Sequence, residues 1–169
     1  PGMVGLNIVL HVGTLFSILL YYHQRIWQLL VKDRWTIVTI IAGTIPAIMV
    51  GLPLKMFAEP FLESPIVAGV MLFVTGGVLL YLRSVPPGTR DYQQLTIGQA
   101  LVIGFFQAAA ILPGLSRSGS TIAGGAGLGL KRSDAATFSF LLAIPAIAGA
   151  GVLEGKSILK GESLGASLD

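Results

Sequence analysis

Residues 113–121, with the sequence PGLSRSGST, contain the side chains best suited to chemistry. One arginine, Arg117, lies there among four hydroxyl side chains, which belong to Ser116, Ser118, Ser120 and Thr121. Apolar runs precede and follow the stretch, at Ala100–Leu112 and Ile122–Leu130. A guanidinium at membrane depth costs about 2.5–3.5 kcal/mol on insertion scales, so an arginine in such a place is expected to have a function.

The residues around Arg117 predict a binding site for an anion. Pro113 and Gly114 would break a helix, and a helix that restarts after them offers unpaired N–H groups and the positive end of its dipole. Gly114 and Gly119 would let a ligand approach the backbone, and a guanidinium is a planar fork that fits phosphate oxygens. Phosphate or diphosphate is the best-fitting ligand. The stretch lacks the Gly-Lys-Ser/Thr ending of a Walker P-loop.

A structural role is the alternative for each of these groups. Arg117 could cap the carbonyls of a neighbouring helix, and the hydroxyls could hold helices together. Gln107 could line the anion site or form an interhelical hydrogen bond. The glycines of the second apolar run are best explained as a packing face, with only Gly119 expected near a ligand. The apolar segments contain no His, Asp or Glu cluster with metal-ligand spacing, so these residues predict no metal site.

The composition predicts one membrane domain covering residues 1–169. The chain is 53% hydrophobic and only 11% charged, whereas soluble domains have about 25% charged residues. It has no cysteines, which excludes disulfides and thiolate metal sites. The net charge of +3 is too small and too dispersed to predict a nucleic-acid partner.

The apolar runs predict an all-α polytopic membrane protein. Spans are expected at about 6–22, 36–56, 65–82 and 135–153, with a loop and an interfacial turn of helix at 23–35 and a loop at 55–64. Residues 96–130 form two arms on either side of Pro113-Gly114, and as helices these arms would be about 25 Å and 18 Å long. Because the hydrocarbon core is about 30 Å thick, we expect a re-entrant hairpin rather than a crossing.

The basic residues support this topology. If the hairpin enters and leaves on one face, seven basic residues fall on that face: Arg25, Lys32, Arg34, Arg83, Arg90, Lys131 and Arg132. Three others fall on the opposite face: Lys55, Lys156 and Lys160. The positive-inside rule then predicts that the first face is cytoplasmic.

A short internal likeness suggests an inverted repeat. Phe16-Ser17-Ile18-Leu19-Leu20 resembles Phe138-Ser139-Phe140-Leu141-Leu142. The two segments lie on predicted spans that run in opposite directions, as an inverted repeat requires.

Residues 113–121 match the pattern PGxSRSGxT, which is similar to the signature of the undecaprenyl-diphosphate phosphatases, the bacterial bacitracin-resistance family. Residues 104–113 (GFFQxxAxxP) and 139–145 (SFLLAxP) also resemble that family, and the likeness extends from about Asn7 to Gly151. The resemblance implies a multi-pass enzyme of the bacterial cytoplasmic (inner) membrane, built from two inverted repeats that each begin with a re-entrant hairpin. The implied reaction is hydrolysis of undecaprenyl diphosphate to undecaprenyl phosphate and phosphate, which recycles the lipid carrier of peptidoglycan synthesis and gives bacitracin resistance.

The resemblance also implies roles for individual residues. The residues implied to be catalytic are Arg117, Ser116, Ser118 and Thr121. Those expected to bind substrate are Gly114, Gly119, Ser120 and Gln107. Family members depend on a divalent cation, Mg or Ca. Their Glu-rich segment, followed by Pro, Ser, Ser and His, does not occur in this sequence. We therefore expect a fragment that is inactive alone, with metal ligands and acid–base carboxylates outside it.

Expected partners are an isoprenoid diphosphate lipid and the surrounding membrane lipids, with a homo-oligomer left open and no nucleic acid. The rival hypothesis is a transporter or flippase for an anionic lipid or solute with Arg117 at its binding site, because broken helices and inverted repeats are also transporter architecture. A third hypothesis is a non-catalytic scaffold in which Arg117 is structural.

Overall fold

The computed structural model describes residues 2–159, excluding the side chains of residues 1–9, 11, 55, 59 and 153–159. The elements, in chain order, are α1 (Gly2–Tyr21), α2 (His23–Val31), α3 (Arg34–Phe57), α4 (Glu59–Leu62), α5 (Pro65–Ser84), the 3-10 turn η1 (Tyr92–Gln94), α6 (Ile97–Ala109), α7 (Arg117–Gly127) and α8 (Arg132–Leu159). Within the described residues the regular structure is helical apart from one bridge between Arg90 and Leu130. The predicted all-α class is confirmed.

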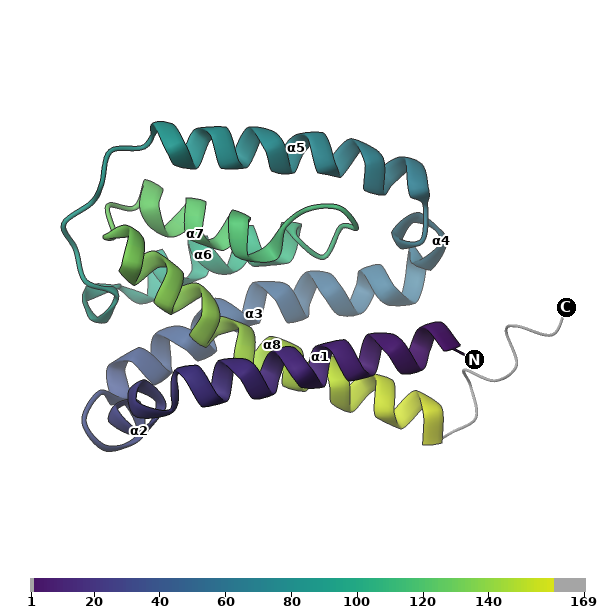
Figure 1. Ribbon diagram of the computed structural model, residues 1–169, viewed down its shortest axis with the longest axis horizontal. Helices are drawn as coiled ribbons and strands as arrows, with labels where there is room; N and C mark the ends of the chain where they lie inside the picture. Colours follow the sequence, from purple (N-terminus) through teal and green to yellow (C-terminus); the bar gives the residue numbers. More distant parts are fainter. Residues whose placement is uncertain (1, 160–169) are drawn as a thin grey trace, which may run out of the picture.

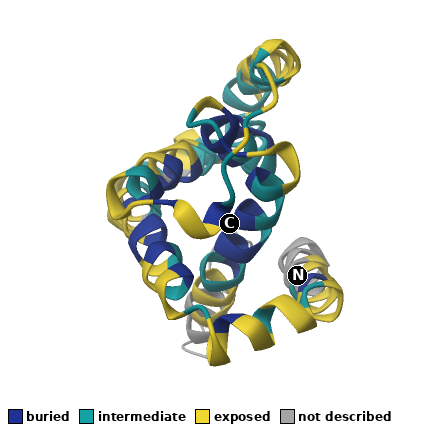
Figure 2. Cartoon of the chain, turned by 90° about the vertical axis from the view of Figure 1, so that its left-hand side faces the viewer, coloured by how far each residue is buried: buried dark blue, intermediate teal, exposed yellow. Residues whose placement is uncertain are grey.

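The long helices α1, α3 and α5 run roughly along the long axis of the molecule, α8 runs obliquely to it, and the shorter pair α6–α7 lies among them (Figure 1). Helix α6 packs on α3, and α7 contacts α5, α6 and α8. The core lies where these helices meet and includes Ile103, Leu130, Phe138, Leu141 and Leu142. Buried residues gather inside the bundle, and exposed residues cover its outer surface (Figure 2).

Among residues 2–159, three helices are long and apolar enough to cross a membrane. They are Arg34–Leu54 in α3, Pro65–Ser84 in α5 and Arg132–Val152 in α8. Helix α5 has no buried residue, and its Ile66 and Phe73 are 79% and 86% exposed. This surface suits contact with lipid. The predicted span at 6–22 is helical in α1, but the side chains of residues 6–9 and 11 lie outside the described part.

The predicted break between two short helices is confirmed. Helices α6 and α7 have 13 and 11 residues, about 20 Å and 17 Å of helix, and they are joined by residues 110–116. Figure 1 shows the joining turn inside the bundle, well short of the far ends of α3 and α5. Helix α6 begins with a capping box between Thr96 and Gln99, and α7 begins with Ser116 as its N-cap.

Helices α3 and α6 approach closely because two glycines face each other. A Cβ added to Gly104 would overlap the backbone carbonyl of Gly43. A Cβ added to Gly43 would lie 3.1 Å from the carbonyl oxygen of Ala100. This contact fixes the first arm of the hairpin against α3.

The prediction of a loop with one turn of helix at residues 23–35 was wrong, because residues 23–31 form the complete helix α2. The polar residues of this segment suggested a loop. The segment is amphipathic, however, and Ile26 and Leu29 pack against the core. The predicted loop at 55–64 also contains a short helix, α4.

The segments that carry the seven basic residues meet at one end of the molecule, on the left of Figure 1. The backbone of Arg90 pairs with Gly129 and Lys131 there, and Lys131 forms an ion pair with Asp91 at 2.6 Å. We call this the basic end. The two ends of the hairpin therefore lie on the same side, whereas the orientation of that side in a membrane stays a prediction. Of the opposite group, the Lys55 and Lys156 side chains and all of Lys160 lie outside the described residues.

Candidate functional site

The turn between α6 and α7 depends on a glycine. Gly114 has φ +86°, a conformation that L side chains rarely adopt, and a Cβ at this position would overlap the carbonyl of Ala68 in α5. On the other side of the turn, the Ile111 side chain reaches Gly51 of α3. The turn is thus held between two candidate spanning helices.

Thr75 fixes the position of the turn along helix α5. Its hydroxyl donates to the Gly114 carbonyl at 2.8 Å and accepts from the Ser116 N–H at 2.9 Å. Thr75 lies near the middle of α5, so the start of α7 lies beside the middle of a helix of spanning length. Sequence reasoning missed Thr75, whose only signal is a hydroxyl in an otherwise apolar span.

Ser116 caps helix α7. Its hydroxyl accepts from the Gly119 N–H at 3.1 Å, and its carbonyl accepts from the Ser120 N–H at 2.9 Å. No acceptor for the N–H groups of Arg117 and Ser118 occurs among the described residues. The first turn of α7 therefore presents two free donors together with the positive end of the helix dipole.

Arg117 is the first residue of α7 and is half-buried. Its guanidinium forms no hydrogen bond and no ion pair with any residue in the described part of the chain. The Ser118 hydroxyl, also half-buried, likewise has no partner there. These two side chains and the free N–H groups all belong to the start of one helix, where an anion with several oxygens can bind.

The Thr121 side chain points toward helix α8. It is 1% exposed, and its hydroxyl bonds the Arg117 carbonyl at 2.9 Å and lies 2.6 Å from the Ser139 hydroxyl of α8. It therefore ties α7 to α8 behind the helix start. Ser139 was not predicted as a site residue, although it lies in one of the family-like segments.

Two buried polar side chains near the turn have no partner in the described part of the chain. Gln107 on α6 is 3% exposed and Ser120 on α7 is 2% exposed, and neither the Gln107 amide nor the Ser120 hydroxyl forms a hydrogen bond with a described residue. An unsatisfied buried polar group costs about 1–3 kcal/mol. Both residues belong to the arms of the hairpin. Their unused donors and acceptors could bind water or a polar ligand.

Comparison with known proteins decides the family. The family model for the bacitracin resistance protein BacA matches residues 2–168. The chain belongs to this family.

Relatives of this BacA-family chain carry one name. A protein of Rhodopirellula baltica called undecaprenyl-diphosphatase is 53% identical over 96% of the chain and 63% of its own length. Proteins with the same name from Thermodesulfovibrio yellowstonii and Acidiphilium cryptum are 43% and 38% identical, over 95% and 91% of the chain. The chain covers 62% and 60% of those two proteins. It thus spans about three fifths of the length of these relatives.

The residues described in this BacA-family chain do not form a metal site. No group of three or more His, Asp or Glu side chains that could hold a metal ion occurs among them. The hydroxyls and guanidinium of the turn are ligands for an anion rather than for a divalent cation. The described residues therefore do not fit the expected Mg or Ca.

The glycines of α7 pack as predicted. A Cβ on Gly124 would meet the Phe106 ring at 2.8 Å, and one on Gly125 would meet Ala135 at 3.1 Å. The helix therefore needs small residues on the faces toward α6 and α8. Gly119 also lacks space, because a Cβ there would lie 3.0 Å from the Ser116 hydroxyl.

Proposed function

We propose that the protein that carries this chain hydrolyses undecaprenyl diphosphate to undecaprenyl phosphate and phosphate. The observation that carries the proposal is the unpaired Arg117 guanidinium at the start of α7, beside the middle of a helix of spanning length. A diphosphate at the end of a lipid would neutralise this charge at membrane depth. The name shared by the relatives supplies the substrate class.

In the proposed site Arg117 and the free N–H groups of Arg117 and Ser118 bind the diphosphate oxygens. Charge that develops on these oxygens during phosphoryl transfer would be stabilised by donors already fixed in place. Gly114 allows the turn to pack on the Ala68 carbonyl, and Gly119 leaves room for the Ser116 cap. Thr75 and Ser116 position the helix start, and Thr121 holds α7 against α8.

The reaction forms a bond between an incoming oxygen and the terminal phosphorus and breaks the bond from that phosphorus to the bridging oxygen. Undecaprenyl phosphate leaves with the bridging oxygen. The oxygen atom of water is incorporated into the released phosphate, and the protons of water are released or taken up by the leaving phosphate. The first attack comes from water or from a serine hydroxyl. Of the two candidate serines, Ser118 is the better placed, because the Ser116 hydroxyl is engaged by the Gly119 N–H. The proposed divalent cation and the general base would come from outside the described residues.

The relatives' name favours hydrolysis over the transporter or flippase hypothesis, which rests on the broken helix and the internal likeness. We further propose a bacterial inner-membrane location with the basic end in the cytoplasm, on the positive-inside rule.

The proposal is tested by phosphate release from undecaprenyl diphosphate in detergent with Mg or Ca. We compare the whole gene product, its Arg117→Ala variant and Arg83→Ala, which removes an exposed arginine from the basic end. We expect Arg117→Ala to lower kcat/KM by about 100-fold or more, a loss typical of a removed donor to a transferring group, and Arg83→Ala to act like the wild type. The isolated 169-residue chain should release no phosphate. Full activity of folded Arg117→Ala protein would refute the proposed site.

A further inference from the structure

Helix α2 (His23–Val31) lies at the basic end and runs across the ends of the long helices (Figures 1 and 2). It exposes Trp27 and Leu30, which are 69% and 59% accessible, and the neighbouring Trp35 of α3 is 48% accessible. Tryptophans at the end of spanning helices are typical of the boundary between lipid and water. Helix α2 therefore has the features of an amphipathic helix that lies in the membrane interface.

A second face of α2 carries donors. Arg25, Gln28 and Lys32 recur at the spacing i, i+3, i+7, which places them on one side of a helix. Gln28 lines two adjoining cavities. One, of about 270 Å³, is shared with Lys32 and with Tyr92 of η1, and the other, of about 500 Å³, is shared with Arg25 and with Thr137 of α8.

The two cations in these cavities lack acidic partners. Among the side chains that the structure describes, no carboxylate lies within 4.0 Å of Arg25 or Lys32. Arg25 makes one hydrogen bond, to the Gln28 amide oxygen at 3.2 Å. Asp33, which also lines the smaller cavity, accepts from the Thr36 N–H at 3.1 Å and from its hydroxyl at 2.6 Å.

Other cations at the basic end already have protein partners. Lys131 pairs with Asp91, Arg132 donates to the Val85 carbonyl at 2.9 Å, and Arg90 donates to the Gln99 side chain at 3.1 Å. Arg25 and Lys32 differ from these three in having no hydrogen-bond partner outside α2 among the described residues, and both line the cavities.

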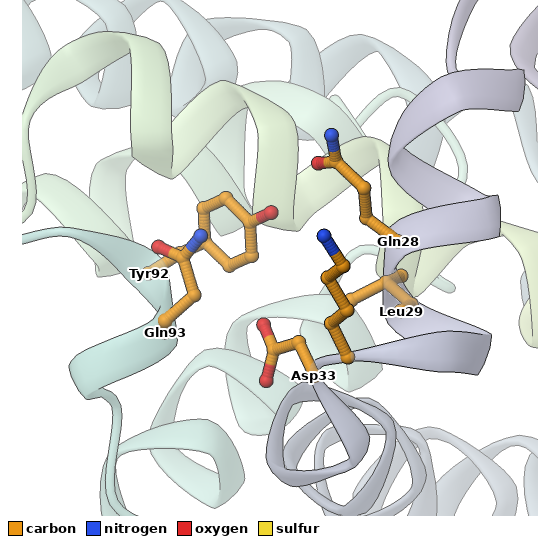
Figure 3. A pocket seen from close by; sticks show the side chains of 6 residues that line it. Gln28, Leu29, Asp33, Tyr92 and Gln93 are labelled. Carbon is orange, nitrogen blue, oxygen red and sulfur yellow. The ribbon is translucent and has the colours of Figure 1, made fainter.

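Neutral donors complete the cavities. Figure 3 shows the Gln28 amide and the Tyr92 hydroxyl directed into the space between α2 and η1. Burial raises the pKa of Tyr92, so its hydroxyl stays protonated and can donate a hydrogen bond. Positive charge and uncharged donors around one space favour an anion with several oxygens.

We propose that the cavities between α2, η1 and α8 bind the phosphodiester headgroup of an anionic glycerophospholipid. A lipid is the expected source of the phosphate, because the helix that carries the donors also exposes Trp27 and Leu30, and the neighbouring Trp35 is exposed as well. None of these three lines a cavity, but their exposure at the same end of the bundle suits contact with acyl chains. Basic pockets between helices on the cytoplasmic side of membrane proteins bind such headgroups. The site lies at the end of the bundle, apart from Arg117 beside the middle of α5, and does not depend on the proposed hydrolysis.

The test is native mass spectrometry of the whole gene product released from detergent, with phosphatidylglycerol, phosphatidylethanolamine or inorganic phosphate added. The double variant Arg25→Gln/Lys32→Gln removes both cations, and Arg83→Gln removes an exposed cation from the same end on α5. Arg25→Lys/Lys32→Arg keeps the charges and controls for effects on folding.

We expect the double Gln variant to retain phosphatidylglycerol about 30-fold less well, since each of the two basic residues contributes about 1 kcal/mol of attraction. Arg83→Gln should have a clearly smaller effect, within about fivefold, because Arg83 lines neither cavity, and the charge-keeping variant should stay within about twofold. Equal loss in Arg83→Gln and in the double Gln variant would overturn the proposal, as would equal retention of phosphatidylethanolamine. Release of the lipid by equimolar inorganic phosphate would show that the site is for free phosphate.

Discussion

At the residue scale, one hydroxyl links α5 to the start of α7. Thr75 bonds both the Gly114 carbonyl and the Ser116 N–H, the two backbone groups on either side of Leu115. The Arg117 guanidinium follows directly and forms no bond to the described residues. Thr75 therefore determines where the free charge lies relative to the bundle without itself facing the proposed ligand.

Replacing Thr75 with valine should displace the helix start. The variant keeps the shape of the side chain but loses both hydrogen bonds, at a cost of about 1–3 kcal/mol in unfolding free energy. We expect phosphate release by the whole gene product to fall more than about tenfold, because misplacement by about 1 Å impairs catalysis. Thr44→Val is the control, since its hydroxyl bonds only the Ile40 carbonyl of its own helix. Equal activity in the two variants would contradict this role for Thr75.

The residue types of the turn were predictable from the sequence, whereas the direction of each hydroxyl was not. Ser116, Ser118 and Thr121 are chemically similar, yet one caps a helix, one is free and one bonds α8. These differences depend on how α7 rotates against its neighbours. That rotation is set by packing between segments distant in sequence, and periodicity within one segment does not encode it.

At the element scale, the hairpin is positioned by close backbone contacts. Gly104 of α6 meets the Gly43 carbonyl of α3, and Gly124 of α7 receives the Phe106 ring. The sequence predicted the small-residue face of α7, because its glycines are closely spaced. The partner of Gly104 was not predictable, because Gly43 lies on a separate helix with no distinguishing pattern.

Gly104→Ala should force α3 and α6 apart. A backbone carbonyl cannot rotate away as a side chain can, so we expect destabilisation of about 1–3 kcal/mol. Gly98→Ala on the same helix is the matched control, because a Cβ there meets nothing within 4 Å. The measurement is the thermal unfolding midpoint in detergent. If Gly104→Ala and Gly98→Ala unfold at the same temperature, the close α3–α6 contact is not present.

Helix α2 shows why polar amphipathic segments are misassigned. Arg25, Lys32, Asp33 and Arg34 gave residues 23–35 the composition of a loop. The segment folds as a helix because Ile26 and Leu29 reach the core on one side while polar side chains remain outside. Tertiary packing thus overrides a weak local preference.

At the scale of the whole molecule, the segments that carry the seven basic residues lie together, whereas the separation from the opposite lysines stays a prediction. The basic segments meet at one end, and the turn of the hairpin lies inside the bundle (Figure 1). Helix α5 precedes the hairpin and α8 follows it. If both ends of the hairpin lie on one side of the membrane, the end of α5 and the start of α8 must lie on that side too. Cysteine labelling tests this directly.

Single cysteines at Ser84 and Ser133, both exposed at the basic end, should react with a membrane-impermeant maleimide only from the cytoplasmic side. A cysteine at the exposed Glu63, between α4 and α5, should react only from the opposite side. The described chain contains no native cysteine, which simplifies the background. Labelling of Ser133→Cys and Ser84→Cys from opposite sides would show that the hairpin crosses the membrane.

The central claim is that Arg117 binds the diphosphate through its planar fork. The most direct test is phosphate release from undecaprenyl diphosphate by the whole gene product carrying Arg117→Lys, with Arg83→Lys as the matched control. Lysine keeps the charge but cannot form two parallel hydrogen bonds to one phosphate. We expect kcat/KM to fall by about tenfold or more in Arg117→Lys, in proportion to the lost charge-assisted bond, and to stay unchanged in Arg83→Lys. Full activity of Arg117→Lys would contradict this claim.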